Sequence, residues 1–225
     1  MTRLQTRTFS SRAELDSALA ARLAASLAAP GPSAVMLSGG TTPMNAYHTV
    51  ARGPLRHDDR LHVLFTDERY VPADSAASNY HQSRALLDAL ALPGEALLRV
   101  RTELPLEAAA ADYDTALSTL LSSGVHVGLG LLGLGADGHT ASLFRAADLE
   151  RARGRYAIAV QRPDGMSAVS VTPDFLATVR EPVFVVAGSD KESAAAALRA
   201  ADPNLVAWQA VAGCSEVELW IAPTG

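Results

Sequence analysis

The sequence predicts an α/β fold in which a mostly parallel sheet is covered by helices on both faces. Short apolar segments typical of buried strands alternate with helical segments along almost the whole chain. Several of these apolar segments end in glycine or polar residues, as strands do where they leave a core. The chain has 225 residues, of which 48% are hydrophobic, enough for a sizeable core. No repeat or linker interrupts it, so we expect one domain over residues 1–225.

The first half of the chain begins with a predicted strand near residues 3–9. A helix follows, because Ser11 and Glu14 have the spacing of a capping box and leucines recur every four residues from Leu15 to Leu27. The segment AVMLSGG, from Ala34, indicates a buried strand that stops at two glycines. The remaining elements of this half are a strand at 61–71 and helices at 42–51, 78–90 and 106–123.

The second half begins with VHVGLGLLGLG, residues 125–135, which indicates a strand that runs into a glycine-rich loop. EPVFVVAG, residues 181–188, is a strong strand, and the helix after it has Ser189 as its expected N-cap. Further strands are expected near 156–161, near 168–172 and at the closing VELWIAP.

Composition and charge exclude several classes of function. The formal net charge is −5, from 24 acidic and 19 basic side chains, and no long basic run occurs, which argues against a nucleic-acid-binding surface. No apolar run reaches the roughly 18 residues that cross a bilayer, so no membrane partner is expected. The N-terminus lacks the apolar core of a signal peptide, and the single Cys214 builds neither a disulfide framework nor a zinc site. We expect a cytoplasmic protein that is a monomer or a small homo-oligomer.

Two turns that follow apolar segments have the features of anion sites. Ligands of parallel α/β sheets bind beyond the carboxyl ends of the strands. In the segment 38–43, SGGTTP, glycines let a ligand approach the backbone, and hydroxyls and a helix N-terminus supply donors. In the segment 188–191, GSDK, the only lysine of a chain with 18 arginines is positioned to reach a phosphate. An ordinary tight turn and a chance surface lysine are the alternatives.

Two further clusters carry acid–base chemistry. Thr66-Asp67-Glu68-Arg69 offers an acid for proton transfer and an arginine for an anion, and a solvated loop with an ion pair is the alternative. Asp137-Gly138-His139 is expected at the start of a helix, where a neutral imidazole acts as a base near pH 7. Free N–H groups of the same turn, with Gly135, are candidates to hold an oxyanion. Asp137 either orients another group or caps the helix, and a purely structural His139 is the alternative.

Gly133, Gly135 and Gly138 also fit the G-x-G-x-x-G pattern of a dinucleotide-binding loop. That motif opens the first βα unit of its domain, and an acidic residue ends a strand about 20 residues later. Here the pattern lies past mid-chain and is followed by AADLERARGR, which does not look like such a strand. We therefore disfavour an NAD-dependent dehydrogenase.

Five motifs together resemble the 6-phosphogluconolactonase family. They are LSGGTTP, FTDERYVP, SNY, GLGADGHTASLF and VVAGSDKESA, in the family's order and spacing from residue 37 to about 194. The resemblance implies a Rossmann-like fold shared with the glucosamine-6-phosphate deaminases, that is, a sugar-phosphate isomerase/deaminase-like fold. It implies hydrolysis of 6-phospho-D-glucono-1,5-lactone to 6-phosphogluconate in the oxidative pentose phosphate pathway. Neither a metal nor an organic cofactor is expected.

The resemblance also implies roles for individual residues. His139 is the base that activates water, and Asp67 orients either His139 or the sugar. Gly39, Gly40, Thr41, Arg69 and Lys191 would hold the phosphate or nearby oxygens. The sugar-phosphate lactone is then the only partner that the site requires.

The chain departs from the family pattern at two positions. Arg145 stands where the family usually has proline after ASLF. Ala168, in AVSVT, falls where the family usually has the arginine of an R-[VI]-[ST]-L-T motif. That arginine is one arm of the family's phosphate site, and we expect Arg162 or Arg145 to substitute for the missing phosphate-binding cation.

Two alternatives remain besides the dehydrogenase. A glucosamine-6-phosphate deaminase would share the SGGTTP loop, the aspartate and the lysine, but such enzymes typically read AFNEP where this chain has ASLF. A non-catalytic sugar-phosphate-binding protein on the same fold would be consistent with Ala168 but leaves His139 and Asp67 unexplained.

Overall fold

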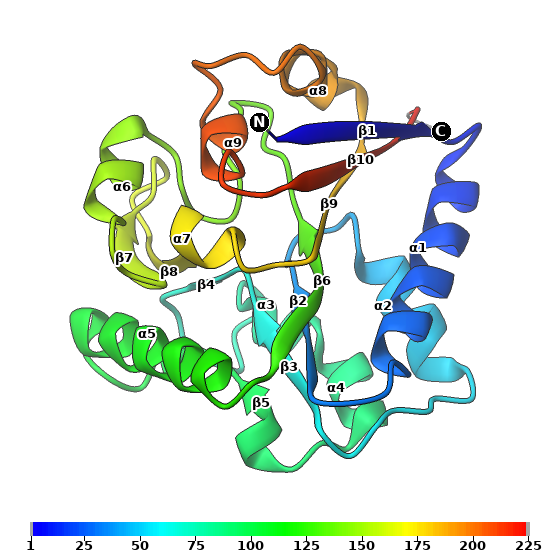
Figure 1. The fold of residues 1–225 in the computed structure, drawn as a ribbon, viewed down its shortest axis with the longest axis vertical. Helices are drawn as coiled ribbons and strands as arrows, with labels where there is room; N and C mark the ends of the chain where they lie inside the picture. Colours follow the sequence, from blue (N-terminus) through cyan, green and yellow to red (C-terminus); the bar gives the residue numbers. More distant parts are fainter. Residues whose placement is uncertain (1, 224–225) are drawn as a thin grey trace.

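The main sheet of the protein contains seven parallel strands. The computed structural model describes residues 2–223. The strand order is β1-β10-β9-β6-β2-β3-β5, and every neighbouring pair is parallel (Figure 1). The strands are β1 (Arg3–Thr8), β2 (Ser33–Leu37), β3 (Leu61–Phe65), β5 (Leu97–Leu98), β6 (His126–Leu132), β9 (Glu181–Ala187) and β10 (Glu216–Ala222). The predicted parallel sheet is therefore confirmed.

Helices cover both faces of this sheet, as predicted (Figure 1). Alternate residues of a strand point to opposite faces, so that Val35 and Leu37 of β2 belong to one core and Ala34 and Met36 to the other. The first core packs under α1 (Arg12–Leu27), α2 (Met44–Arg52) and α4 (Arg84–Leu90). The second packs under α5 (Leu106–Ser122), α7 (Pro173–Leu176), α8 (Glu192–Arg199) and α9 (Val206–Ala210). None of the helices within residues 2–223 is both long and apolar enough to span a bilayer.

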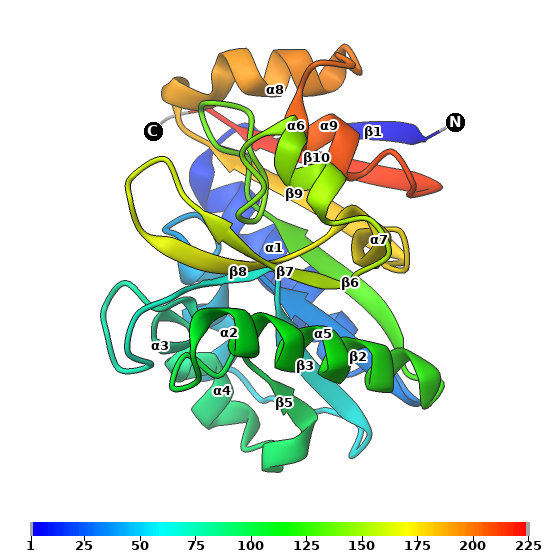
Figure 2. The same ribbon diagram turned by 90° about the vertical axis from the view of Figure 1, so that its left-hand side faces the viewer.

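A second, antiparallel sheet of three strands lies beside the main one. Its order is β4-β8-β7, formed by β4 (Asp67–Arg69), β8 (Ser167–Val171) and β7 (Ala157–Gln161). Figure 2 shows it between α5 and α6 (Ala146–Arg151). The prediction of a single strand at 61–71 was wrong, because the structure has two strands there, β3 and β4. The chain leaves the main sheet at Thr66, whose N–H still donates to Leu37 O of β2 while its carbonyl accepts from Val171 N of β8.

Two helix boundaries and one capping bond also differ from the prediction. The helix predicted at 78–90 is divided into α3 (Asn79–Gln82) and α4 at Ser83, whose hydroxyl donates to Asn79 O at 3.0 Å. Ser189 is not an N-cap, because a 3-10 helix spans Ser189–Lys191 and α8 begins at Glu192 without a side-chain cap. At the start of α1, Ser11 accepts from Glu14 N as expected, but Glu14 accepts from Ser10 N. The helices α6, α7 and α9, strand β5 and the 3-10 helix Gly94–Ala96 were not predicted.

Two buried tyrosines hold the ends of neighbouring strands. The hydroxyl of Tyr47, on α2, accepts from Ser38 N at 3.1 Å and donates to Ser38 O at 2.9 Å. The hydroxyl of Tyr113, on α5, accepts from Phe65 N at 3.0 Å and donates to Phe65 O at 2.6 Å. Burial raises the pKa of each hydroxyl above the ordinary value for tyrosine. Both hydroxyls therefore remain protonated and able to donate a hydrogen bond. The two tyrosines thus fix the backbone where β2 and β3 give way to loops.

Replacement of Tyr113 by phenylalanine tests this clamp. Tyr113→Phe deprives the buried backbone of Phe65 of its hydroxyl partner, and we expect it to lower the free energy of unfolding in urea by about 1–3 kcal/mol. Tyr156→Phe is the matched control. The Tyr156 ring packs on Phe175, but its hydroxyl has no hydrogen-bond partner in the described part of the chain, so a change within about 0.5 kcal/mol is expected. Equal stability of the two variants would contradict the clamp.

Candidate active site

A polar pocket of about 230 Å³ opens where the parallel strands end. The loops after β2 and β6, strand β4 and the first residue of α3 (Asn79–Gln82) form most of its wall. The β7–β8 turn and the segment after β9 complete it. It brings together most of the residues singled out from the sequence: Gly39, Gly40, Asp67, Arg69, Gly135, His139, Arg162 and Lys191. The other lining residues are Ser38, Asn79, Gly133, Leu134 and Ala141.

The remaining predicted site residues lie outside this pocket. Thr41 lines an adjoining cavity of about 210 Å³, which shares Gly39, Gly40 and Lys191 with the first. Asp137 and Gly138 lie on the same loop as His139 without lining either cavity. Arg145 is exposed and lines neither cavity, so of the two arginines offered as substitutes only Arg162 faces the pocket.

His139 lies on a loop and not at the start of a helix, so that expectation was wrong. The next helix, α6, begins only at Ala146. The turn is closed by its own backbone, since Gly135 N donates to His139 O at 2.9 Å and Gly138 N donates to Gly135 O at 3.0 Å. These two N–H groups are therefore not free to bind an oxyanion. Glycine at position 135 leaves room for the His139 ring, because a Cβ there would lie 2.1 Å from His139 Nδ1.

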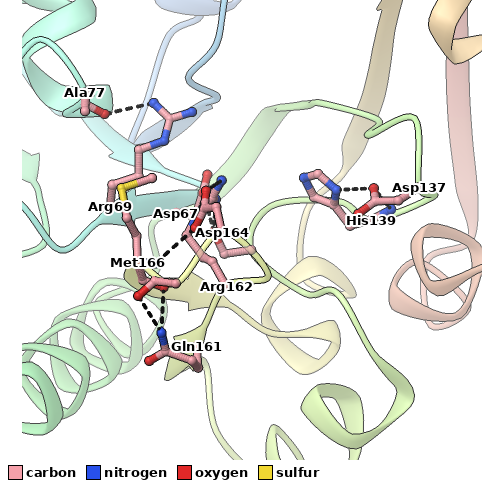
Figure 3. A network of polar contacts seen from close by, with 11 residues as sticks. Asp67, Arg69, Ala77, Asp137, His139, Gln161, Arg162, Asp164 and Met166 are labelled. Carbon is pink, nitrogen blue, oxygen red and sulfur yellow. Dashed lines mark hydrogen bonds and ion pairs between the residues drawn. The ribbon is translucent and has the colours of Figure 1, made fainter.

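Asp137 holds one atom of the His139 ring, Nδ1. His139 Nδ1 lies 2.5 Å from Asp137 Oδ1, and the backbone N–H of His139 points to the same oxygen at 3.3 Å (Figure 3). Burial raises the pKa of the Asp137 carboxyl, but the hydrogen bonds from His139 lower it, and the net result lies below the ordinary value. An ionised acceptor at Nδ1 places the proton there, which leaves the Nε2 lone pair available.

Asp67 makes no hydrogen bond to His139 within residues 2–223 and instead joins other segments of the site. Its carboxylate accepts from Ser142 Oγ at 2.6 Å and from Thr66 Oγ1 at 2.9 Å. The Asn79 side-chain amide donates to Asp67 O at 2.8 Å and lies 3.3 Å from Asp67 Oδ1. Asp67 as a whole residue is 7% exposed and still lines the pocket. Of the two roles expected for Asp67, orienting His139 belongs instead to Asp137.

Sequence reasoning did not single out Asn79, which lines the pocket, or Ser142, which bonds to the lining residues Asp67 and Arg162. Asn79 also touches the loop after β2, where a Cβ on Gly39 would lie 1.9 Å from Asn79 Oδ1. Both residues belong to motifs that carry the family resemblance, SNY and ASLF. Membership of those motifs was the signal that would have identified them.

Glu68 anchors the SNY segment and does not face the pocket. Its carboxylate accepts from Ser78 Oγ and from the backbone N–H groups of Asn79 and Tyr80, at 2.7–3.0 Å. Burial raises the pKa of the Glu68 carboxyl above its ordinary value, against these hydrogen bonds, which lower it. Within the Thr66–Arg69 cluster, Asp67 and Arg69 are thus the residues that line the pocket, while Glu68 fixes the start of α3.

Three cations line the pocket. Arg69 Nη1 donates a hydrogen bond to Ala77 O at 2.8 Å (Figure 3). Arg162, on the β7–β8 turn, pairs with Asp164 at 3.0 Å and donates to Ser142 Oγ at 3.3 Å, and its side chain is 13% exposed. Ala168 is fully buried in β8, in register with Arg69 of β4. Arg162 thus supplies a positive charge from the hairpin that carries Ala168.

The loop after β2 is held in an open shape by side chains from outside it. Arg12 of α1 donates to Thr42 O at 2.8 Å, and Gly40 N donates to Gln82 Oε1 at 3.2 Å. The N–H groups of Gly39, Thr41 and Thr42 have no partner within residues 2–223. Free N–H groups beside Lys191 form a cradle suited to an anion. Across the described residues, no three His, Cys, Asp or Glu side chains gather as a potential metal-binding group.

The tautomer of His139 can be measured directly. We expect 15N spectra above the pH of imidazole titration to show a protonated Nδ1 and an unprotonated Nε2. Asp137→Ala removes the acceptor and should shift His139 toward the Nε2-protonated form, whereas Asp174→Ala, a change of the same kind elsewhere, should not. A wild-type Nε2-protonated ring would contradict the arrangement described above.

Comparisons with known proteins agree on one family. The family model described as glucosamine-6-phosphate isomerases/6-phosphogluconolactonase matches residues 10–220. A 6-phosphogluconolactonase of Treponema pallidum is 37% identical over 175 residues, which cover 75% of this chain and 72% of the relative. One of Synechocystis sp. is 36% identical over 199 residues, covering 81% and 79%.

Solved structures agree on the fold. The 6-phosphogluconolactonase of Thermotoga maritima superimposes with a TM-score of 0.81 at 25% identity, covering 99% of this chain and 100% of the other. A monomeric glucosamine-6-phosphate deaminase gives 0.80 at 15% identity and covers 97% of each chain, which shows the shared fold alone. The chain belongs to the glucosamine-6-phosphate isomerase/6-phosphogluconolactonase family.

Proposed function

We propose that the chain hydrolyses 6-phospho-D-glucono-1,5-lactone to 6-phospho-D-gluconate, as a cytoplasmic enzyme of the oxidative pentose phosphate pathway. One observation carries this proposal: the pocket holds His139, with Nδ1 bound to Asp137, together with Lys191, Arg69 and Arg162. A neutral base among cations suits an anionic sugar ester. The names of the curated relatives support the same substrate.

The phosphate fits best at the loop after β2. There the unpartnered N–H groups of Gly39, Thr41 and Thr42 lie along cavities that Lys191 also lines. Charge-assisted hydrogen bonds of this kind are about twice as strong as neutral ones. Arg69 lines the larger cavity only, together with His139. The sugar then extends from Lys191 toward His139, with its hydroxyls against Asp67 and Asn79.

His139 Nε2 acts as the general base. It accepts a proton from water while the water oxygen attacks C1 of the lactone, and a tetrahedral intermediate forms. The C1–O5 bond then breaks, and the imidazolium returns its proton to O5, which becomes the 5-hydroxyl. The new carboxylic acid at C1 ionises and releases one proton to solvent. General acid–base catalysis of this type contributes about 10²- to 10⁴-fold.

The developing negative charge at C1 needs a donor other than the turn that holds His139, since Gly135 N and Gly138 N are already used. Arg162 is the suitable group. It lines the same pocket, its guanidinium is a planar fork of N–H donors, and Ser142 and Asp164 hold it in place. No covalent nucleophile is required, because a δ-lactone is an activated ester.

Proton release from freshly prepared 6-phosphogluconolactone tests the proposal. Wild type should exceed the spontaneous rate by a wide margin, and His139→Ala should fall to about that rate. Turnover at background by both proteins would contradict the assignment. Binding of phosphate without turnover would then favour a sugar-phosphate-binding protein, and ammonia release from glucosamine 6-phosphate would favour a deaminase.

The two candidate arginines give a sharper comparison. Arg162→Ala should lower kcat/KM by about 10- to 100-fold, as expected from the loss of a charged hydrogen bond of about 1.5–3 kcal/mol. Arg145→Ala removes an equal charge from a residue outside both cavities and should leave kcat/KM within about twofold. An equal loss in both variants, or a loss only in Arg145→Ala, would refute the role given to Arg162.

A further inference from the structure

We propose that Phe144 is a positioning residue for His139, an inference that rests on the proposed function. The Phe144 and His139 rings lie with centroids 4.3 Å apart and planes inclined by 36°. The Arg162 guanidinium also lies over the Phe144 ring, with its Cζ 5.2 Å from the ring centroid. The benzyl ring therefore contacts both the proposed base and the proposed cation.

The backbone of the loop builds this contact. A short antiparallel bridge joins Thr140 to Leu143, with Leu143 N donating to Thr140 O at 2.9 Å. Between them Ala141 has a φ of 50°, a left-handed conformation that side chains other than glycine rarely adopt. The chain therefore reverses sharply between His139 and Phe144. On the far side, Phe144 N donates to Asp148 Oδ2 at 3.1 Å, which ties the loop to α6.

His139 needs a second support because Asp137 fixes only one atom of its ring. The Asp137 side chain is 56% exposed and lies on the same loop, so a bond to it leaves the imidazole free to swing about Nδ1. A ring packed against the imidazole restricts that motion and fixes the direction of Nε2. Near-attack geometry is sensitive to such changes, since a misplacement of about 1 Å can cost 10²-fold in rate.

Arg162 has supports that do not depend on Phe144. It pairs with Asp164 through Nε and Nη2, at 3.0–3.3 Å, and donates to Ser142 Oγ. Removal of the benzyl ring should therefore leave Arg162 near its place and act mainly on His139. The consequence is a loss in kcat with little change in KM.

The test compares Phe144→Leu with Phe144→Tyr in the lactonase assay. Phe144→Leu should lower kcat by about tenfold or more while KM changes by less than about threefold. Phe144→Tyr keeps the ring and should retain at least about half of the wild-type kcat. A wild-type kcat in Phe144→Leu, a change confined to KM, or a failure of tyrosine to restore kcat would each overturn the proposal.

Phe9 provides a matched control. Its ring likewise contacts an arginine and a second aromatic ring, with Arg7 Cζ 4.7 Å and the Trp220 ring centroid 5.3 Å from its own centroid. Phe9 lies in the core with α1 and lines neither cavity of the site. Phe9→Leu removes the same kind of contact elsewhere. It should leave kcat unchanged even if it lowers stability. An equal fall in kcat in both variants would mean that Phe144 acts only through general stability.

A spectroscopic measurement separates this inference from the proposed function. The ring current of Phe144 should displace the Hε1 and Hδ2 resonances of His139, which are identified by their loss in His139→Gln. Phe144→Leu should return them toward the positions of a free imidazole, and Phe144→Tyr should not. Unmoved resonances in Phe144→Leu would refute the contact. Failure of the wild type to hydrolyse the lactone, with the resonances displaced as expected, would instead refute the proposed function.

Discussion

The carboxylate of Asp67 is the constraint on which the arrangement of the site depends. It follows the point where the chain passes from one sheet to the other, and it is almost wholly buried. It accepts from Ser142, on the loop that carries His139, and lies beside the amide of Asn79, which contacts Gly39. A buried charge is costly unless it is hydrogen-bonded, so these segments are held together before any substrate arrives.

The two sheets explain why this carboxylate is available. Strand β3 of the main sheet ends at Phe65, whose backbone N–H and carbonyl both form hydrogen bonds with the Tyr113 hydroxyl. The next strand, β4, then pairs with β8 of the second sheet. The hairpin of β7 and β8 carries Arg162 at its turn, above the ends of the parallel strands. Without the change of sheet at Thr66, neither Asp67 nor Arg162 would lie beside the loops that follow β2 and β6. Preorganisation of this kind lets modest acid–base catalysis suffice for an activated ester.

The order of strands and helices could largely be predicted from the sequence, because apolar periodicity records which face of each element is buried. The break at Thr66 could not, since β3 and β4 are both extended and share one pattern. Glycine-rich turns and the lone lysine predicted some of the residues that line the pocket, among them Gly39, Gly40 and Lys191. The bond between Ser142 and Asp67 spans 75 residues, so no local spacing records it. For the same reason, the sequence alone could not tell that Arg162 lines the pocket and Arg145 does not.

A crystal structure of His139→Ala with bound 6-phosphogluconate would test the central claim most directly. The account predicts phosphate oxygens in hydrogen-bond contact with Lys191 Nζ and the N–H groups of the loop after β2. It predicts the C1 carboxylate beside the space left by the imidazole, with Arg162 next to it. A phosphate bound away from Lys191 and that loop, or a C1 carboxylate remote from position 139, would contradict the account.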